Sequence, residues 1–215
     1  MKMKFLTLSL VAVLAACNKS PANNMAANQA APAAEGNSAG LPTPPDRSAA
    51  AGGEAAMPAG LDCVRNRLTP EQRRAAAQLA MEQGSREDPR AQALLQAVDA
   101  CASELSWSPQ KRQLATMFSI SAAGAAGLRE EFRSRGIQIE ELDQIILSDR
   151  ELMAAAESDQ LNAEVGQSFA LRHRAELERI AGGQSLEGEL GSRMGNYLGF
   201  IALVQVSSTR FANAS

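Results

Sequence analysis

The stretch SPQKRQLATMFSISAAGAAGLREEFRSRG, residues 108–136, decides the fold class of this chain. Its core-forming side chains recur at alternating spacings of four and three residues, at Leu114, Phe118, Ser121, Ala125, Leu128 and Phe132. That spacing places them on one face of an α-helix, which turns once in about 3.6 residues. Ser108 before Pro109 is typical of a helix start, and Gly136 is typical of a helix end. The stretch therefore predicts one long helix with a buried face.

The other prolines of the C-terminal part mark two more helix starts. Thr69-Pro70 and Asp88-Pro89 each place a capping residue before a proline, and Thr69 with Gln72 fits a capping box. Only 4% of the residues are aromatic, which favours closely packed helices over a sheet. We expect an all-α domain over residues 61–215, a bundle-like arrangement of five or six helices.

Three further helices are expected after Gly136. One starts at Ile139, and the sequence Ser148-Asp149-Arg150-Glu151 offers a capping box at which it could restart. Another covers about residues 159–180, and the last covers about 185–206.

The last predicted helix contains four glycines, Gly188, Gly191, Gly195 and Gly199, on one side. An interior glycine costs a helix about 1 kcal/mol relative to alanine, so close approach of another backbone must compensate. One interpretation is internal packing against the small residues of the helix at 109–135, around Ser119, Ala123 and Gly127. The others are a homodimer seam, or a groove for a partner helix or an acyl chain.

The N-terminus has the order of an export signal. Lys2 and Lys4 precede an apolar run over residues 5–16, which is shorter than the roughly 20 residues of a membrane-spanning helix. The tetrapeptide Leu14-Ala15-Ala16-Cys17 resembles the lipobox of bacterial lipoproteins. The resemblance covers residues 1–17 and implies cleavage after residue 16 and lipid attachment to Cys17. Asn18, in place of an aspartate, favours the outer membrane by the same resemblance.

Residues 17–60 are predicted to be the lipidated cysteine and a disordered tether. Residues 18–60 contain six of the nine prolines, five charged residues and no aromatic residue. Such a composition buries too little apolar surface to offset the entropy of ordering. The chain thus divides into a signal peptide (1–16), an anchor and tether (17–60) and a helical domain (61–215).

Two cysteines remain once Cys17 is assigned to lipid. Cys101 shares a helix face with Leu94 and Val98, so it is expected to point inward. If the helices starting at Pro70 and Pro89 form an antiparallel hairpin, the end of the second lies beside Cys63. An exported protein can form disulfides, so we predict a Cys63–Cys101 bond, with two free thiols as the alternative.

The composition excludes several kinds of site. A formal net charge of −3 gives no basic surface for nucleic acid, and one histidine with three cysteines cannot build a multi-histidine metal site or a zinc finger. We predict neither a cofactor nor a metal. Ser108-Pro109-Gln110-Lys111 matches the S-x-x-K spacing of penicillin-binding proteins and β-lactamases, but no K-T-G or S-D-N element follows. Ser108 is more simply a helix cap.

These observations favour a lipid-anchored helical protein facing the periplasm, with a non-enzymatic role in binding or envelope interaction. Its expected partners are the membrane, through the lipid, and an envelope protein, an apolar ligand or a second copy of the chain. The alternative is a hydrolase-type enzyme with a site assembled around His173 and a carboxylate. If His173 has no catalytic role, the sequence predicts a half-buried histidine whose ring is hydrogen-bonded to Glu176 or to a backbone carbonyl.

Overall fold

The structure, a computed structural model, describes residues 58, 60–82, 84 and 87–214. It contains nine helices and no strand within that part of the chain, which confirms the all-α fold class. The predicted signal peptide, Cys17 and nearly all of the predicted tether lie outside the described residues. No helix among the described residues is long and apolar enough to cross a lipid bilayer.

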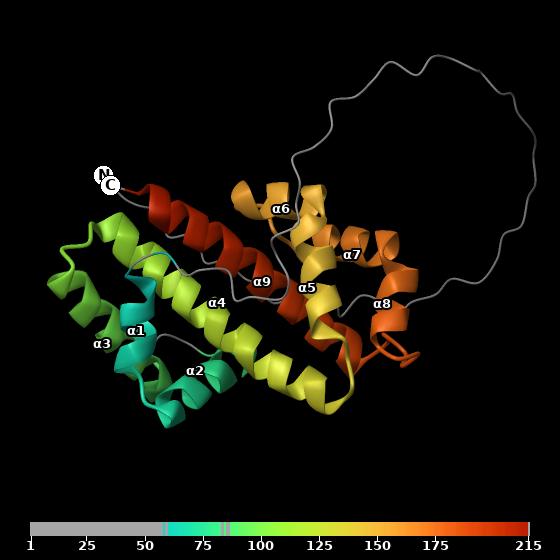
Figure 1. Cartoon of the computed structure of the whole chain (residues 1–215), viewed down its shortest axis with the longest axis horizontal. Helices are drawn as coiled ribbons and strands as arrows, with labels where there is room; N and C mark the ends of the chain where they lie inside the picture. The colour runs from blue at the N-terminus through green and yellow to red at the C-terminus, as the bar shows by residue number, and fades with distance from the viewer. Residues whose placement is uncertain (1–57, 59, 83, 85–86, 215) are drawn as a thin grey trace, which may run out of the picture.

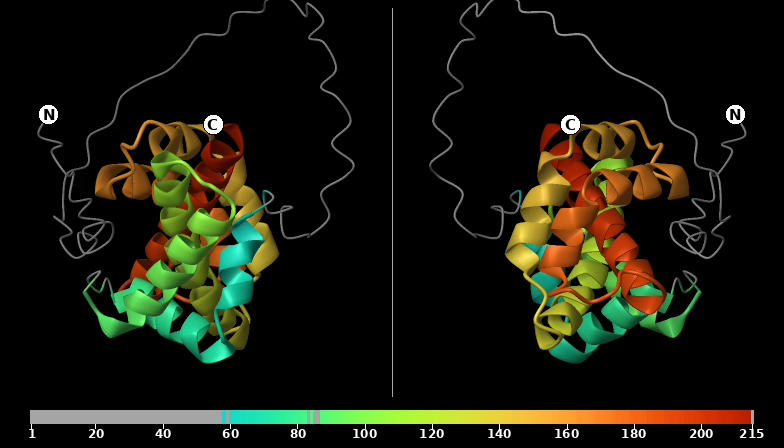
Figure 2. Two further views of the ribbon diagram at one scale, coloured as in Figure 1. Left: turned by 90° about the vertical axis from the view of Figure 1, so that its left-hand side faces the viewer. Right: turned by 90° about the vertical axis from the view of Figure 1, so that its right-hand side faces the viewer.

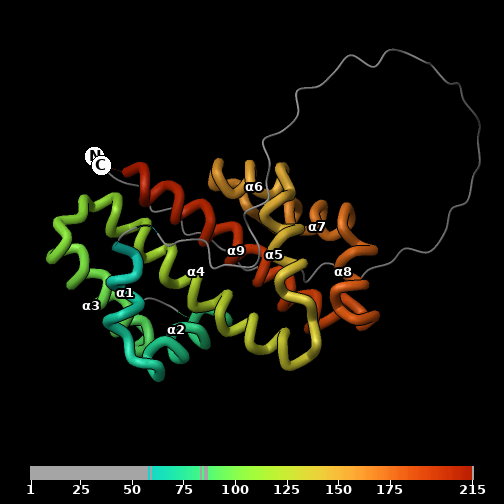
Figure 3. Tube along the Cα trace, viewed as in Figure 1, coloured from blue at the N-terminus to red at the C-terminus, as the bar shows by residue number. Residues whose placement is uncertain are grey.

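Two long helices, α4 (Pro109–Ser134) and α9 (Glu189–Asn213), form the centre of the molecule. They lie side by side and run in opposite directions, as Figures 1 and 3 show. Gly124 of α4 faces the ring of Phe200 in α9, whose nearest carbon lies 2.6 Å from the position of a Cβ built on the glycine. The absence of a side chain at Gly124 therefore makes room for an aromatic ring at the centre of this helix pair.

The shorter helices cover the two ends of this pair. The first three lie along α4: α1 (Leu61–Arg67), α2 (Pro70–Glu82) and α3 (Pro89–Glu104). The other four form a second group, in which α5 (Ile139–Ser148), α6 (Arg150–Glu157) and α7 (Ala163–Arg172) contact α9, and α8 (Arg174–Ile180) contacts α5 and α7. Figure 2 shows both groups from the two ends of the molecule.

Each group has its own apolar core. Around α1, α3 and the first half of α4, the buried side chains include Leu61, Val64, Leu94, Val98, Leu114 and Phe118, together with Phe211 near the end of α9. Around α5, α7 and α8, they include Phe132, Ile139, Leu142, Ile146, Phe169 and Ile180, together with Tyr197 of α9. The two central helices therefore contribute to both cores and connect them.

The predicted helix starts at prolines are confirmed. The carboxylate of Asp88 accepts a hydrogen bond from the Arg90 amide at 2.8 Å, and the hydroxyl of Ser108 accepts one from the Lys111 amide at 3.3 Å. Thr69 and Gln72 exchange two hydrogen bonds, as a capping box requires. Local hydrogen bonds of this kind depend only on neighbouring residues, so they are visible in the sequence.

The predicted number of helices, five or six, is too low. Residues 61–67 form a helix of their own, and a break at His173 divides the predicted segment 159–180. The break at Asp149 falls where the sequence offered a restart. Asp149 has extended backbone angles, ends α5 and begins α6. The last helix also begins and ends later than predicted, at Glu189 and Asn213.

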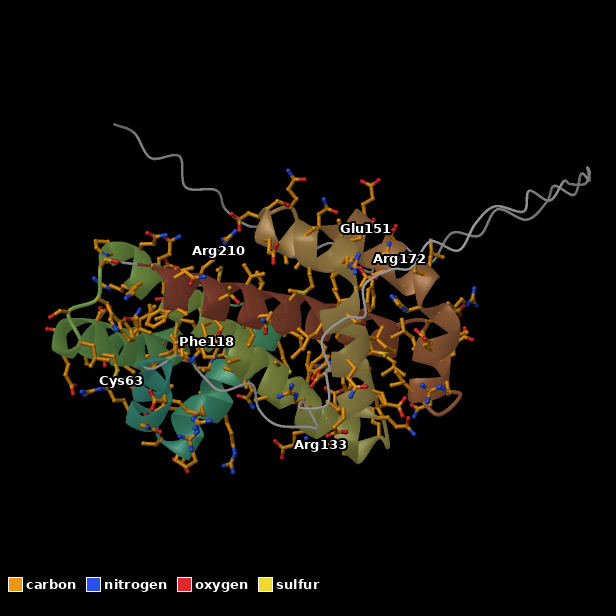
Figure 4. All side chains as sticks on the ribbon, turned by 45° about the horizontal axis from the view of Figure 1, so that its top comes forward. Cys63, Phe118, Arg133, Glu151, Arg172 and Arg210 are labelled. Atoms are coloured by element: carbon orange, nitrogen blue, oxygen red, sulfur yellow. A yellow bond between two sulfur atoms is a disulfide. The ribbon has the colours of Figure 1, made fainter. Side chains whose placement is uncertain are left out.

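The predicted disulfide is present. Cys63 in α1 and Cys101 in α3 are bonded, with their Cα atoms 6.1 Å apart. Cys101 is completely buried on the same face as Leu94 and Val98, as its helical spacing predicted. The bond attaches the first helix of the domain to the third, on the side of the molecule where Figure 4 labels Cys63.

Candidate functional site

The four glycines predicted as a packing face have separate structural roles. Gly188 is not inside a helix: it precedes α9 with φ at 72°, a conformation that favours glycine. At Gly191, a Cβ would lie 1.9 Å from the carbonyl oxygen of Leu186, so the loop before α9 folds against this residue. Gly195 is buried, and Gly199 is buried with no heavy atom within 4 Å of a Cβ built on it.

One interpretation of the sequence is that the glycines of α9 pack against the small residues of α4. The structure shows different contacts for these two faces. Gly127, on the small face of α4, lies against α2, where its Cβ would be 3.2 Å from that of Ala77. Helix α9 instead places Phe200 against Gly124 of α4. At Gly127, this face of α4 is covered by α2. Helix α9 is nonetheless central, as expected, because it contacts α5, α6 and α7 as well as α4.

A second candidate site surrounds the only histidine of the chain, at the break between α7 and α8. Nδ1 of His173 lies 2.8 Å from the Glu176 carboxylate, and Nε2 lies 2.9 Å from Oδ2 of Asp149. The ring also packs on Phe169, with ring centroids 4.8 Å apart. Of the two partners that the sequence offered, Glu176 or a backbone carbonyl, the structure has Glu176. Asp149 is 24 residues away in the chain, and only the fold brings it to the ring.

Asp149 is the centre of this cluster. Its side chain is 6% exposed, and it accepts a hydrogen bond from the backbone N–H of Leu152 as the cap of α6. Arg172 donates to both carboxylate oxygens of Asp149 and, through another nitrogen, to Glu151 at 2.6 Å. Figure 4 shows Glu151 and Arg172 beside one another where α6 meets α7. One carboxylate thus joins α6 to the junction of α7 and α8.

The charges in this cluster stabilise one another. Burial alone would lower the pKa of His173, but its hydrogen bonds to Glu176 and Asp149 have the larger combined effect and raise the pKa above its ordinary value of 6.5. Burial would raise the pKa of Asp149, but the Leu152 amide, His173 and Arg172 together lower it below 3.8. The arrangement therefore favours a protonated imidazole between two carboxylates.

The contacts of His173 differ from those of the catalytic base that a hydrolase would need. The fold does bring His173 to a carboxylate, as the hydrolase alternative requires. A general base, however, needs a ring nitrogen directed at a nucleophile or substrate, and both ring nitrogens of His173 contact carboxylates. The hydroxyl of Ser168 accepts a hydrogen bond from Arg172 at 2.7 Å. These contacts are those of a polar cluster that connects α6, α7 and α8.

A third polar cluster was not predicted from the sequence. The hydroxyl of Tyr197 donates to Asp143 at 2.6 Å and accepts from Nε of Arg129 at 2.7 Å, and Arg129 also donates to Asp143 at 2.6 Å. The three residues come from α9, α5 and α4. Burial and the bond to Asp143 raise the pKa of Tyr197 far above its ordinary value of 10.0, so the phenol remains a neutral donor.

For the chain as a whole, the absence of a metal site remains a prediction. Among the residues that the structure describes, no three histidine, cysteine, aspartate or glutamate side chains are grouped so that they could hold a metal ion. Comparison with protein-family models, with characterised proteins and with solved structures gave no match.

Proposed function

We propose that this protein is a bacterial lipoprotein whose helical domain acts by non-covalent binding within the cell envelope. The proposal assigns lipid to Cys17, the tether to residues 17–60 and the binding role to the domain from residue 61. The lipobox resemblance of residues 14–17 and the proline-rich composition that follows support the anchor and tether. The partner class is an envelope protein or a second copy of the chain, and the resemblance at Asn18 favours the outer membrane.

The observation that supports a non-enzymatic role is that both ring nitrogens of His173 contact carboxylates. Its two nitrogens lie within 2.9 Å of Glu176 and Asp149, so the strongest candidate for a catalytic base is committed to holding helices together. Other charged groups of the domain are also paired between elements. Arg179 of α8 bonds Glu141 of α5 at 2.6 Å, and Arg210 of α9 pairs with Asp159 at 2.9 Å.

Acylation is tested by growing cells with a clickable fatty acid and isolating the full chain. We expect label on the wild type and none on Cys17→Ser. The matched control is Cys63→Ser, which also loses one cysteine and should keep the label. Label that persists in Cys17→Ser would overturn the assignment of the anchor.

The binding role is tested separately. Crosslinking in intact cells should give a discrete adduct with the anchored chain, and sedimentation of the purified chain distinguishes a homodimer from another partner. A serine-reactive fluorophosphonate probe addresses the hydrolase alternative. We expect no labelling of the chain, and labelling that disappears in His173→Gln would overturn the non-enzymatic proposal.

A further inference from the structure

Helix α1 is attached to the domain at one end of the molecule and contributes little to the rest of the core. Leu61 and Val64 are each 1% exposed, and their main neighbours are in α3 and α4. Arg67 forms an ion pair with Glu104 in α3, and Arg73 of α2 donates to the carbonyls of Arg65 and Leu68. The larger apolar core, around α5, α7, α8 and α9, contains no residue of α1.

By itself α1 is too short to be stable. It has seven residues, and the residue that precedes it, Gly60, provides no side-chain cap. Isolated helices shorter than about 12 residues are marginal in water even for favourable sequences. The Arg67–Glu104 pair is exposed, at 42% and 58%, and pairs of that kind contribute little. The position of α1 therefore depends on its two buried side chains, on the hydrogen bonds from Arg73 at its C-terminal end and on the covalent bond from Cys63.

The two cysteines of the disulfide differ in exposure. Cys101 is completely buried, whereas Cys63 is partly exposed. Of the two cysteines, only Cys63 therefore has any part exposed to an external thiolate. After cleavage, Cys101 would remain in the core as a small, nearly apolar side chain.

From these observations we propose that the Cys63–Cys101 bond is a redox latch: it holds α1 on the domain, and its reduction releases α1 while α2–α9 stay folded. The reductant is a protein dithiol. Its first thiolate attacks Sγ of Cys63, the S–S bond breaks, and Cys101 leaves as a thiolate that takes up a proton. The second thiol of the reductant then displaces Cys63 as a thiol, so the reductant becomes a disulfide and two electrons pass to the protein.

Release would change the surface beneath α1. Leu94 and Val98 of α3 and Leu114 and Phe118 of α4 share a cluster with Leu61 and Val64, so they lose apolar cover when α1 leaves. The only tryptophan of the chain reports this event. A Cβ built on Gly60 would lie 3.4 Å from Cζ2 of Trp107, so the chain entering α1 passes against the indole.

The test is hydrogen exchange on the full chain with Cys17→Ser, so that the outcome does not depend on acylation. We compare the oxidised protein with the same chain carrying Cys63→Ser and Cys101→Ser. Amides of residues 61–68 should exchange about a hundredfold faster in the double variant, while those of α4 and α9 stay protected. Trp107 emission should shift to longer wavelength.

The control is Arg67→Ala, which removes the ion pair to Glu104 and leaves the disulfide. Residues 61–68 should remain protected in this variant. Two results would overturn the proposal: protection of α1 that survives loss of the disulfide, or loss of protection in all helices together. A dithiol such as reduced dithiothreitol should reproduce the double variant.

Discussion

One nitrogen of Arg172, at the end of α7, donates hydrogen bonds to both carboxylate oxygens of Asp149, at the start of α6, at 2.9 and 3.0 Å. The same carboxylate caps α6 through the Leu152 amide and contacts His173. A residue that the sequence marks as a local helix cap is thus also a long-range connection.

Replacing Asp149 by asparagine should destabilise the domain by about 2–3 kcal/mol. Asparagine can still cap α6, but it removes the charge that Arg172 and His173 share. The matched control is Asp159→Asn. Asp159 is 64% exposed beside Arg210 and has φ at 58°, which asparagine tolerates, so the control should cost less than about 1 kcal/mol. Urea unfolding measures both, and equal losses would contradict the central role of Asp149.

The stability of the domain should fall as the pH rises through the pKa of His173. That pKa is raised in the folded protein above its ordinary value of 6.5. The folded state therefore binds the proton more tightly, so the contribution is complete below 6.5 and disappears as the pH passes the raised value. Urea unfolding at intervals from pH 5 to pH 9 should show the decline. His173→Gln should remove it, since this is the only histidine; an unchanged profile in that variant would contradict the assignment.

Removing the hydroxyl of Tyr197 should destabilise the domain by about 1–3 kcal/mol. Tyr197→Phe leaves Arg129 and Asp143 with one hydrogen-bond partner fewer in a half-buried position. The ring contact with Phe132, at 5.5 Å between centroids, is retained, so packing is not the cause of the loss. Thermal and urea unfolding measure the effect, and a neutral result would show that water replaces the hydroxyl without cost.

Two glycine-to-alanine substitutions should have opposite signs. Gly124→Ala places a methyl group 2.6 Å from the buried ring of Phe200 and should cost about 1–3 kcal/mol. Gly199→Ala meets no heavy atom within 4 Å and should stabilise α9 by up to about 1 kcal/mol. Both are helix-interior positions, so each serves as the control for the other. Destabilisation by Gly199→Ala would indicate that something unseen packs against that face.

Much of the helical architecture was predictable because its causes are local. A capping residue followed by proline fixes a helix start through hydrogen bonds between near neighbours, as at Asp88 and Ser108. The spacing of Leu114, Phe118 and Leu128 fixes which face of α4 is buried. The inward direction of Cys101, and with it the pairing with Cys63, follows from the same periodicity and a short hairpin.

The tertiary structure alone decided the rest, because it depends on residues far apart in the chain. Tyr197 meets Arg129 across 68 residues and Asp143 across 54, and no local pattern links them. The sequence identified interior glycines, but only the fold shows that Gly191 accommodates a carbonyl from its own loop and Gly124 a ring from α9. Periodicity specifies which side of a helix is buried, whereas the partner that covers it depends on how all the helices fill the same space.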